Sequence, residues 1–167
     1  YGSDAGEHMI GIQPATDLSY DMWRYPWSSS GAFVAFSVFS AGLHALVAVG
    51  ILAFGRSGAA GRSRSAAWGV ALVVAGTALL LVGELLSILV RDARSDDTSA
   101  TIVGIAVFGV GGILSTIGFL VLGRATLRAG AWHGWRRYTP LATGIWLSAM
   151  AVFALGFSLY ALILPEV

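Results

Sequence analysis

Four long apolar stretches, separated by short polar segments, dominate the hydropathy pattern of this chain. A helix needs about 20 apolar residues to cross the hydrocarbon core of a bilayer, and each stretch reaches that length. The expected spans are residues 31–54, 66–90, 100–122 and 141–164. A charge or a proline lies close to the end of each one. The pattern therefore predicts an all-α integral membrane protein whose four transmembrane helices form an up-down bundle.

Arginines in the connecting segments predict how these helices are oriented. The link between spans one and two and the link between spans three and four contain arginines but no acidic residue. Those arginines are Arg56, Arg62 and Arg64 in the first link, and Arg124, Arg128, Arg136 and Arg137 in the second. Loops rich in arginine stay in the cytoplasm. We therefore expect both termini on the outer side of a cell inner membrane.

The segment before the first span has two parts. It opens "YGSDAGEHM", and the dipeptides GS and HM are common at cloning junctions, so we interpret residues 1–8 as a cloning remnant. A mature end left by signal-peptide cleavage is the alternative. Residues 9–30 are the expected outer tail, in which residues 14–27 are typical of a helix lying on the membrane surface. Partner docking is the alternative role for that helix, and the interfacial anchor is the simpler one.

Small residues recur at helical spacing along every expected span. Lipid tails are as apolar as leucine, so helices in a membrane associate through close packing at small residues and through hydrogen bonds. The residues expected at helix contacts are Gly76, Gly83, Gly104, Gly111, Ser115, Gly118, Gly144 and Ser148. We interpret them as the packing faces of a compact bundle. A second subunit could approach through similar faces, which would make the protein an oligomer.

Two ionisable residues, His44 and Glu84, fall well inside the expected spans. An ionisable group within the membrane is a functional candidate by default. With a rise of about 1.5 Å per residue, His44 lies near the midplane and Glu84 about 9 Å below the outer boundary. We predict a polar seam for a proton or ligand that contains both residues together with Thr77, Ser87 and Ser37. The alternative is structural: Glu84 fastens its helix to a neighbour, or reaches toward water or an arginine such as Arg91, and His44 is hydrogen-bonded within the bundle.

Composition changes this picture mainly by exclusion. The 167-residue chain is 56% hydrophobic and 11% charged, whereas soluble domains average about 25% charged residues. Every basic residue is arginine, which is typical of a GC-rich bacterial genome. The absence of cysteine excludes disulfides and thiolate metal sites. A net charge of +1, without a basic stripe, argues against nucleic acid as a partner.

Catalytic and cofactor motifs are missing from the sequence. It has no phosphate-binding loop, dinucleotide fingerprint, zinc-protease helix or nucleophile elbow. Glu84 has no second carboxylate and His44 no second histidine within a span. The aspartates of residues 91–97 could hold a divalent cation, but the arginines among them favour a charge-balanced turn. We therefore expect no catalytic residue, no metal and no cofactor.

These observations favour transport or permeation of a small solute, ion or proton along the polar seam. Almost equally, the chain fits a non-catalytic accessory or scaffold subunit of a larger membrane complex, docked through its tail and its small-residue faces. A membrane enzyme is the third interpretation, weakened by the shortage of catalytic groups. A transporter requires a cavity that reaches Glu84 or His44, whereas an accessory subunit requires a tightly packed interior.

Overall fold

The computed structural model describes residues 30–90, 98 and 102–163, and within these residues the chain is helical, without strands. The described residues include four α-helices, and a π-helix and a 3₁₀-helix precede the third and the fourth of them. The helices in chain order are α1 (Ser30–Arg56), α2 (Arg64–Leu89), η2 (Ile102–Gly109), α4 (Val110–Ala129), η3 (Gly134–Tyr138) and α5 (Thr139–Ile163). The tail at residues 9–29, its surface helix and the aspartate-rich link at 91–97 lie outside the described residues.

Three of these helical stretches are long and apolar enough to cross a membrane. They are Gly31–Arg56, Arg64–Leu89 and the continuous run Ile102–Ala129, which joins η2 to α4. Their length and composition support the prediction of a membrane protein with transmembrane helices. Helix α5, of 25 residues, covers residues 141–163 of the fourth expected span. Its passage through the bilayer stays a prediction.

Local chemistry explains where several helices begin and end. Ser63 caps α2, because its side-chain oxygen accepts a hydrogen bond from the backbone N–H of Ala66 at 3.2 Å. Gly130 ends α4 in a left-handed conformation, with φ 64°, that other residues adopt at a cost. Pro140 lies at the second position of α5, where the missing N–H removes no bond within the helix.

The turn between α1 and α2 depends on two glycines with positive φ, Gly58 at 74° and Gly61 at 77°. The Gly61 N–H donates to the Gly58 carbonyl at 2.8 Å, which closes the turn. Between them, Ala59 and Ala60 are buried. Ala60 joins a small apolar core with residues of α2 and α4: Ala66, Leu122 and Ala125. The turn is therefore packed against the helices that it connects.

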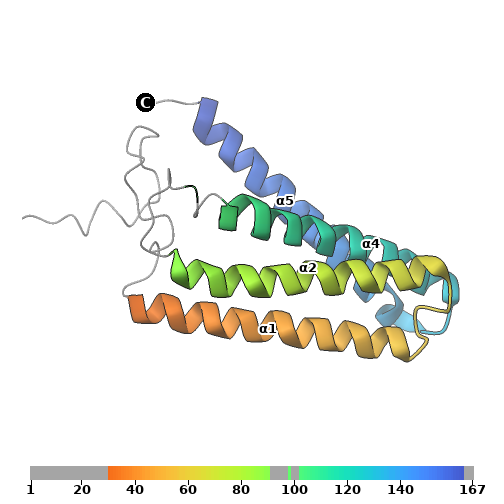
Figure 1. Ribbon diagram of the computed structural model, residues 1–167. Helices are drawn as coiled ribbons and strands as arrows, with labels where there is room; N and C mark the ends of the chain where they lie inside the picture. Colours follow the sequence, from red (N-terminus) through yellow and green to blue (C-terminus); the bar gives the residue numbers. More distant parts are fainter. Residues whose placement is uncertain (1–29, 91–97, 99–101, 164–167) are drawn as a thin grey trace, which may run out of the picture.

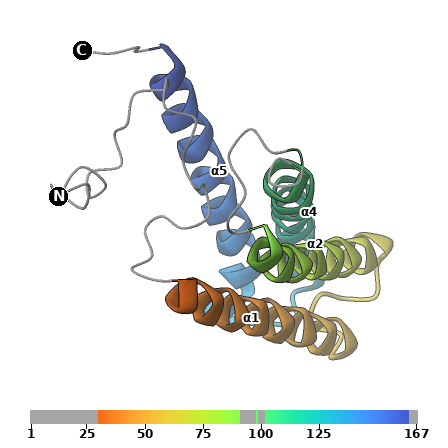
Figure 2. The same cartoon turned by 60° about the vertical axis from the view of Figure 1, so that its left-hand side comes forward.

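The helices pack in a row, with α2 and α4 in the middle. Extensive contacts join α1 to α2, α2 to α4, and α4 to α5, with η3 touching α4 and α5. Consecutive helices run in opposite directions (Figure 1). Beyond its contact with α4, α5 diverges from the other helices (Figure 2). The described helices thus form an open arrangement, and the compact closed bundle stays a prediction.

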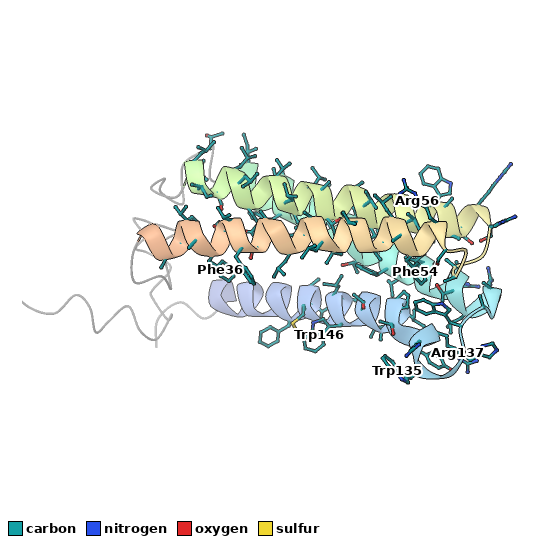
Figure 3. The ribbon with its side chains drawn as sticks, turned by 90° about the horizontal axis from the view of Figure 1, so that it is seen from below. Phe36, Phe54, Arg56, Trp135, Arg137 and Trp146 are labelled. Carbon is teal, nitrogen blue, oxygen red and sulfur yellow. The ribbon has the colours of Figure 1, made fainter. Side chains whose placement is uncertain are left out.

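Within the described part of the chain, the positive charge gathers at one end of the helices. Seven arginines belong to the described residues, and all lie where α1 and α4 end and where α2 and η3 begin: Arg56, Arg62, Arg64, Arg124, Arg128, Arg136 and Arg137. Exposed aromatic side chains, Trp135 among them, lie at the same end (Figure 3). Phe54 of α1 packs edge-on against Trp132, with ring centroids 4.9 Å apart, and so ties α1 to the link before α5.

Candidate functional site

Helices α2 and α4 approach each other closely at Gly76. A Cβ added to Gly76 would lie 2.5 Å from the backbone nitrogen of Ser115 and 2.7 Å from the carbonyl oxygen of Gly111, and closer still to the Ser115 hydroxyl. Only a hydrogen atom fits in this space. In return, a Cβ on Gly111 would lie 3.0 Å from the carbonyl oxygen of Gly76. The two backbones therefore meet with Cα–H groups facing carbonyl oxygens, a contact that recurs at helix interfaces.

The same antiparallel register continues along the α2–α4 contact. Gly69 faces the backbone of Leu122, and Gly118 faces the backbone nitrogen of Val73, at 2.6 Å from its added Cβ. Gly83 faces the ring of Phe108. Seven residues along α2 thus correspond to seven residues back along α4, which is the spacing of a left-handed helix pair. The predicted small-residue faces of α2 and α4 lie opposite each other.

The contact between α4 and α5 is less extensive than that between α2 and α4. A Cβ on Gly123 would lie 2.5 Å from the backbone of Leu141, and one on Gly144 would lie 2.8 Å from the backbone of Leu120. The Ser148 hydroxyl bonds to the Gly144 carbonyl of its own helix at 2.8 Å, so it adds no bond between helices. Both glycine contacts lie near the start of α5, which agrees with the divergence of its other end in Figure 2.

Two buried serines join α1 to α2 near the opposite end of the molecule. Ser37 is 1% exposed and Ser87 is 2% exposed, and their hydroxyl oxygens lie 3.5 Å apart. The Ser87 hydroxyl also donates to the carbonyl oxygen of Glu84 at 2.7 Å. The 3.5 Å between the two hydroxyl oxygens is long for a hydrogen bond, so the pair contributes only modestly to stability. The pair nevertheless shows which residues of α1 and α2 stand opposite each other.

A pocket of about 350 Å³ opens beside the two serines. It is lined by Phe33, Phe36 and Ser37 of α1, by Glu84 and Ser87 of α2, and by Gly104 and Phe108 of η2. We call this cavity the Glu84 pocket. Its volume lies within the range of small-molecule sites, about 300–1,000 Å³. Carboxylate, hydroxyl and aromatic groups are therefore present together in the membrane-spanning part of the protein.

Glu84 is the only acidic residue among the described residues. Among the described residues that line the pocket, none carries a basic side chain. Carboxylates bind cations directly, and aromatic ring faces attract them through their quadrupole. The chemistry of the Glu84 pocket therefore suits a proton or a small cation better than an anion.

The structure leaves two members of the predicted polar seam outside this pocket. Thr77 is buried, but its hydroxyl bonds to the Val73 carbonyl of its own helix at 2.8 Å. Nδ1 of His44 is buried and makes no hydrogen bond of standard geometry within the described residues, although the backbone of Ser40 interacts with the ring. The serine pair places Glu84 level with Ser40, one turn before His44, or about 6 Å along the axis. The participation of Thr77 and His44 in one seam with Glu84 stays a prediction.

Sequence reasoning did not identify the aromatic lining of the pocket. Phe33 and Ser37 are four residues apart, so they share a face of α1, and this spacing was available in the sequence. Phe108 could not be identified from α-helical spacing, because it enters the pocket from a π-helix, whose turn is wider than that of an α-helix. Gly104, expected at a helix contact, is one of the residues that line the pocket, and its role in helix packing stays a prediction.

No cluster of three or more metal-binding side chains occurs within the described ranges. The arrangement offers one carboxylate, two hydroxyls and three aromatic rings in a membrane-embedded cavity. Comparison with protein families, with curated proteins and with solved structures finds no match to this chain.

Proposed function

We propose that this protein passes a proton or a small cation across a bacterial cell membrane by way of Glu84. The observation that carries the proposal is the Glu84 pocket between α1, α2 and η2, whose described lining contains one carboxyl group, that of Glu84. A carboxylate in the membrane is stable only when a proton or a cation neutralises it. Exchange of one for the other is the elementary step of a proton or cation pathway. Two buried hydroxyls beside the carboxyl can coordinate either species.

The proposal includes a topology with four spans and both termini outside the cell. The seven arginines at one end support a cytoplasmic location for that end, because positive loops stay inside. Trp68, Trp135 and Tyr138 are exposed at the same end, as expected of aromatic side chains at the headgroup level. The Glu84 pocket, at the other end of α2, then lies in the outer part of the membrane. In this topology α5 forms the fourth span.

Self-association is part of the same proposal. The outer face of α1 carries large exposed apolar side chains, including Phe39 at 62%, Leu46 at 68% and Val49 at 63%. Within the described residues, the lining of the Glu84 pocket stays at one end of α1 and α2, so this pocket does not by itself form a path through the membrane. A second copy packed against the row would supply the missing wall. We therefore expect the conducting form to be an oligomer.

Proton uptake into proteoliposomes tests the proposal. Vesicles that contain pyranine and the purified protein are exposed to a potassium diffusion potential, and the internal pH is followed by fluorescence. We expect Glu84→Gln, which keeps the shape but removes the ionisable group, to reduce uptake to the level of empty vesicles. Glu84→Asp should retain part of it. External tetramethylammonium should slow proton uptake if the pocket also accepts an organic cation.

Thr116→Val is the matched control for this assay. The Thr116 hydroxyl bonds to the Gly112 carbonyl of its own helix at 2.8 Å, so its removal changes the polarity of a span without reaching the pocket. Its uptake should equal that of the wild type. Equal uptake by wild type and Glu84→Gln would overturn the proposal. So would wild-type uptake no greater than that of protein-free vesicles.

A role as an accessory subunit of a membrane complex is the second candidate. The open arrangement favours it, because α1 packs extensively against α2 alone and α5 diverges from its neighbours (Figures 1 and 2). Helices with one neighbour leave long apolar faces for another protein or for lipid. Under this role the purified chain carries no flux, and Glu84→Gln alters only its stability.

A further inference from the structure

A second cavity lies between α1 and α2 at the arginine-rich end, far from the Glu84 pocket. Its volume is about 720 Å³, and its lining is mostly apolar. Leu52 and Gly55 of α1 form one side, and the outward face of α2 forms the other. Arg56 and Arg62 lie at its mouth. We call this cavity the arginine groove.

Small side chains make the groove along α2. Ala67, Ala71, Ala75 and Ala78 line it, spaced four, four and three residues apart, so they share one helix face. All four are exposed, because this face points away from α4. Larger residues at these positions would fill the space beside α1. The alanine face therefore leaves the arginine groove open, as a long apolar surface between α1 and α2, toward the surroundings of the helices.

The mouth of the groove is positively charged and held in place by the turn. Arg56 ends α1, and Arg62 follows Gly61, whose positive φ closes the turn. Both arginine side chains are exposed, and within the described ranges no carboxylate pairs with either. Guanidinium groups bind phosphate oxygens in a bidentate way. An anion at this mouth would find two arginines and no competing acid nearby.

The groove is long enough to cross the hydrocarbon of one bilayer leaflet. From Ser63 at the mouth to Ala78 at the far end, α2 rises about 22 Å, which exceeds the roughly 15 Å of hydrocarbon in one leaflet. Trp68 is 66% exposed on the same helix, one residue beyond Ala67. Because tryptophan prefers the headgroup level, the mouth lies among headgroups and the alanine face among acyl chains.

We propose that the arginine groove binds an anionic phospholipid, with its phosphate between Arg56 and Arg62 and one acyl chain along the alanine face. Charge complementarity selects this occupant, because a basic mouth above an apolar channel fits an anion attached to a hydrocarbon chain. A helix of a partner protein would bury the same apolar face but would not by itself neutralise the two arginines. The site is independent of the Glu84 pocket and of the proposed function.

Native mass spectrometry of the detergent-purified protein tests this site. The protein is titrated with phosphatidylglycerol, with phosphatidylcholine of the same acyl chains, and with inorganic phosphate. We expect one phosphatidylglycerol to bind at least tenfold more tightly than phosphatidylcholine. Replacement of both arginines, Arg56→Gln with Arg62→Gln, should weaken phosphatidylglycerol binding about 25-fold. The pair Arg124→Gln and Arg128→Gln, with the same change in charge at the same end, should change it less than twofold.

The acyl-chain half of the proposal has its own variant. Ala71→Leu fills the middle of the groove without changing charge and should weaken binding of both lipids, whereas Ala142→Leu, on an exposed face of α5, should not. All these positions are exposed, so folding is retained, and circular dichroism checks it. Equal binding of the two lipids, or equal losses for the two arginine pairs, would overturn the proposal. Displacement of the lipid by an equal concentration of inorganic phosphate, or an unchanged affinity in Ala71→Leu, would do so too.

Discussion

Replacement of Gly76 by alanine is expected to destabilise the protein, although alanine is the better helix former. The added methyl carbon would lie 2.5 Å from the Ser115 nitrogen and 2.7 Å from the Gly111 oxygen. Ordinary van der Waals contact begins near 3.4 Å, so α2 and α4 must separate by nearly 1 Å. Both obstacles are backbone atoms, so a change of rotamer cannot relieve the clash. The separation also loosens the contacts at Gly69 and Gly118.

The magnitude follows from two opposing terms. Overpacking of a well-packed interface costs about 1–3 kcal/mol, and a rigid backbone obstacle places Gly76→Ala at the upper end. The gain in helix propensity from glycine to alanine offsets about 1 kcal/mol of that cost. We therefore expect the free energy of unfolding to fall by about 2 kcal/mol. Gly83→Ala should cost less, because its obstacle is the end of the Phe108 ring, which can turn aside.

Gly112→Ala is the control, since Gly112 lies in the same helix as Ser115 but has no atom within 4 Å of its added Cβ. The free energy of unfolding of Gly112→Ala should be the same as that of the wild type, or higher by up to about 1 kcal/mol. Equilibrium unfolding in mixed micelles with increasing dodecyl sulfate, followed by far-ultraviolet circular dichroism, measures all three variants. If Gly76→Ala unfolded at the same dodecyl sulfate fraction as Gly112→Ala, the close approach of α2 and α4 at this level would be refuted.

Two further predictions concern the turn and the serine pair. Gly61→Ala should lower the free energy of unfolding by about 1–2 kcal/mol, because φ is +77° at this position. Gly50→Ala, where the added Cβ has open space around it, should not lower it. Thermal unfolding in detergent compares the two variants, and equal midpoints would contradict the role of the turn. Ser37→Ala and Ser87→Ala should show a coupling energy of about 0.6 kcal/mol in a double-mutant cycle, the average for hydrogen bonds between membrane helices. A coupling of zero would mean that the two hydroxyls do not interact.

Much of the helical structure could be predicted from the sequence, because hydropathy is a property of one segment at a time. Each expected span falls within or largely overlaps a helix of the structure. The helices extend beyond the spans at the basic end, where Arg56, Arg64 and Arg128 lie inside α1, α2 and α4. Arginine is a good helix former and its long side chain reaches water from a helix end, so apolar length alone underestimates the helix.

The candidate site could be predicted only in part. Glu84 stands out in the sequence because it is ionisable within an apolar run, and the hydroxyl of Ser87, three residues later, follows from helical spacing. The distance between Glu84 and His44 could not be predicted, because it depends on the register of α1 against α2. That register is seen in the pairing of Ser37 with Ser87, a contact between residues fifty positions apart.

The sequence by itself determined that this is a helical membrane protein, where its apolar helices lie, and which end is basic. Only the tertiary structure decided which glycines leave no room for a side chain, since Gly76 meets a neighbouring backbone whereas Gly42 and Gly50 meet nothing within 4 Å. It also decided that Glu84 faces a pocket with Phe108, and that Arg56 and Arg62 stand at the mouth of a groove. The physical reason is that apolar length acts within one helix, whereas a pocket, a groove or a close contact exists only between helices in a particular register.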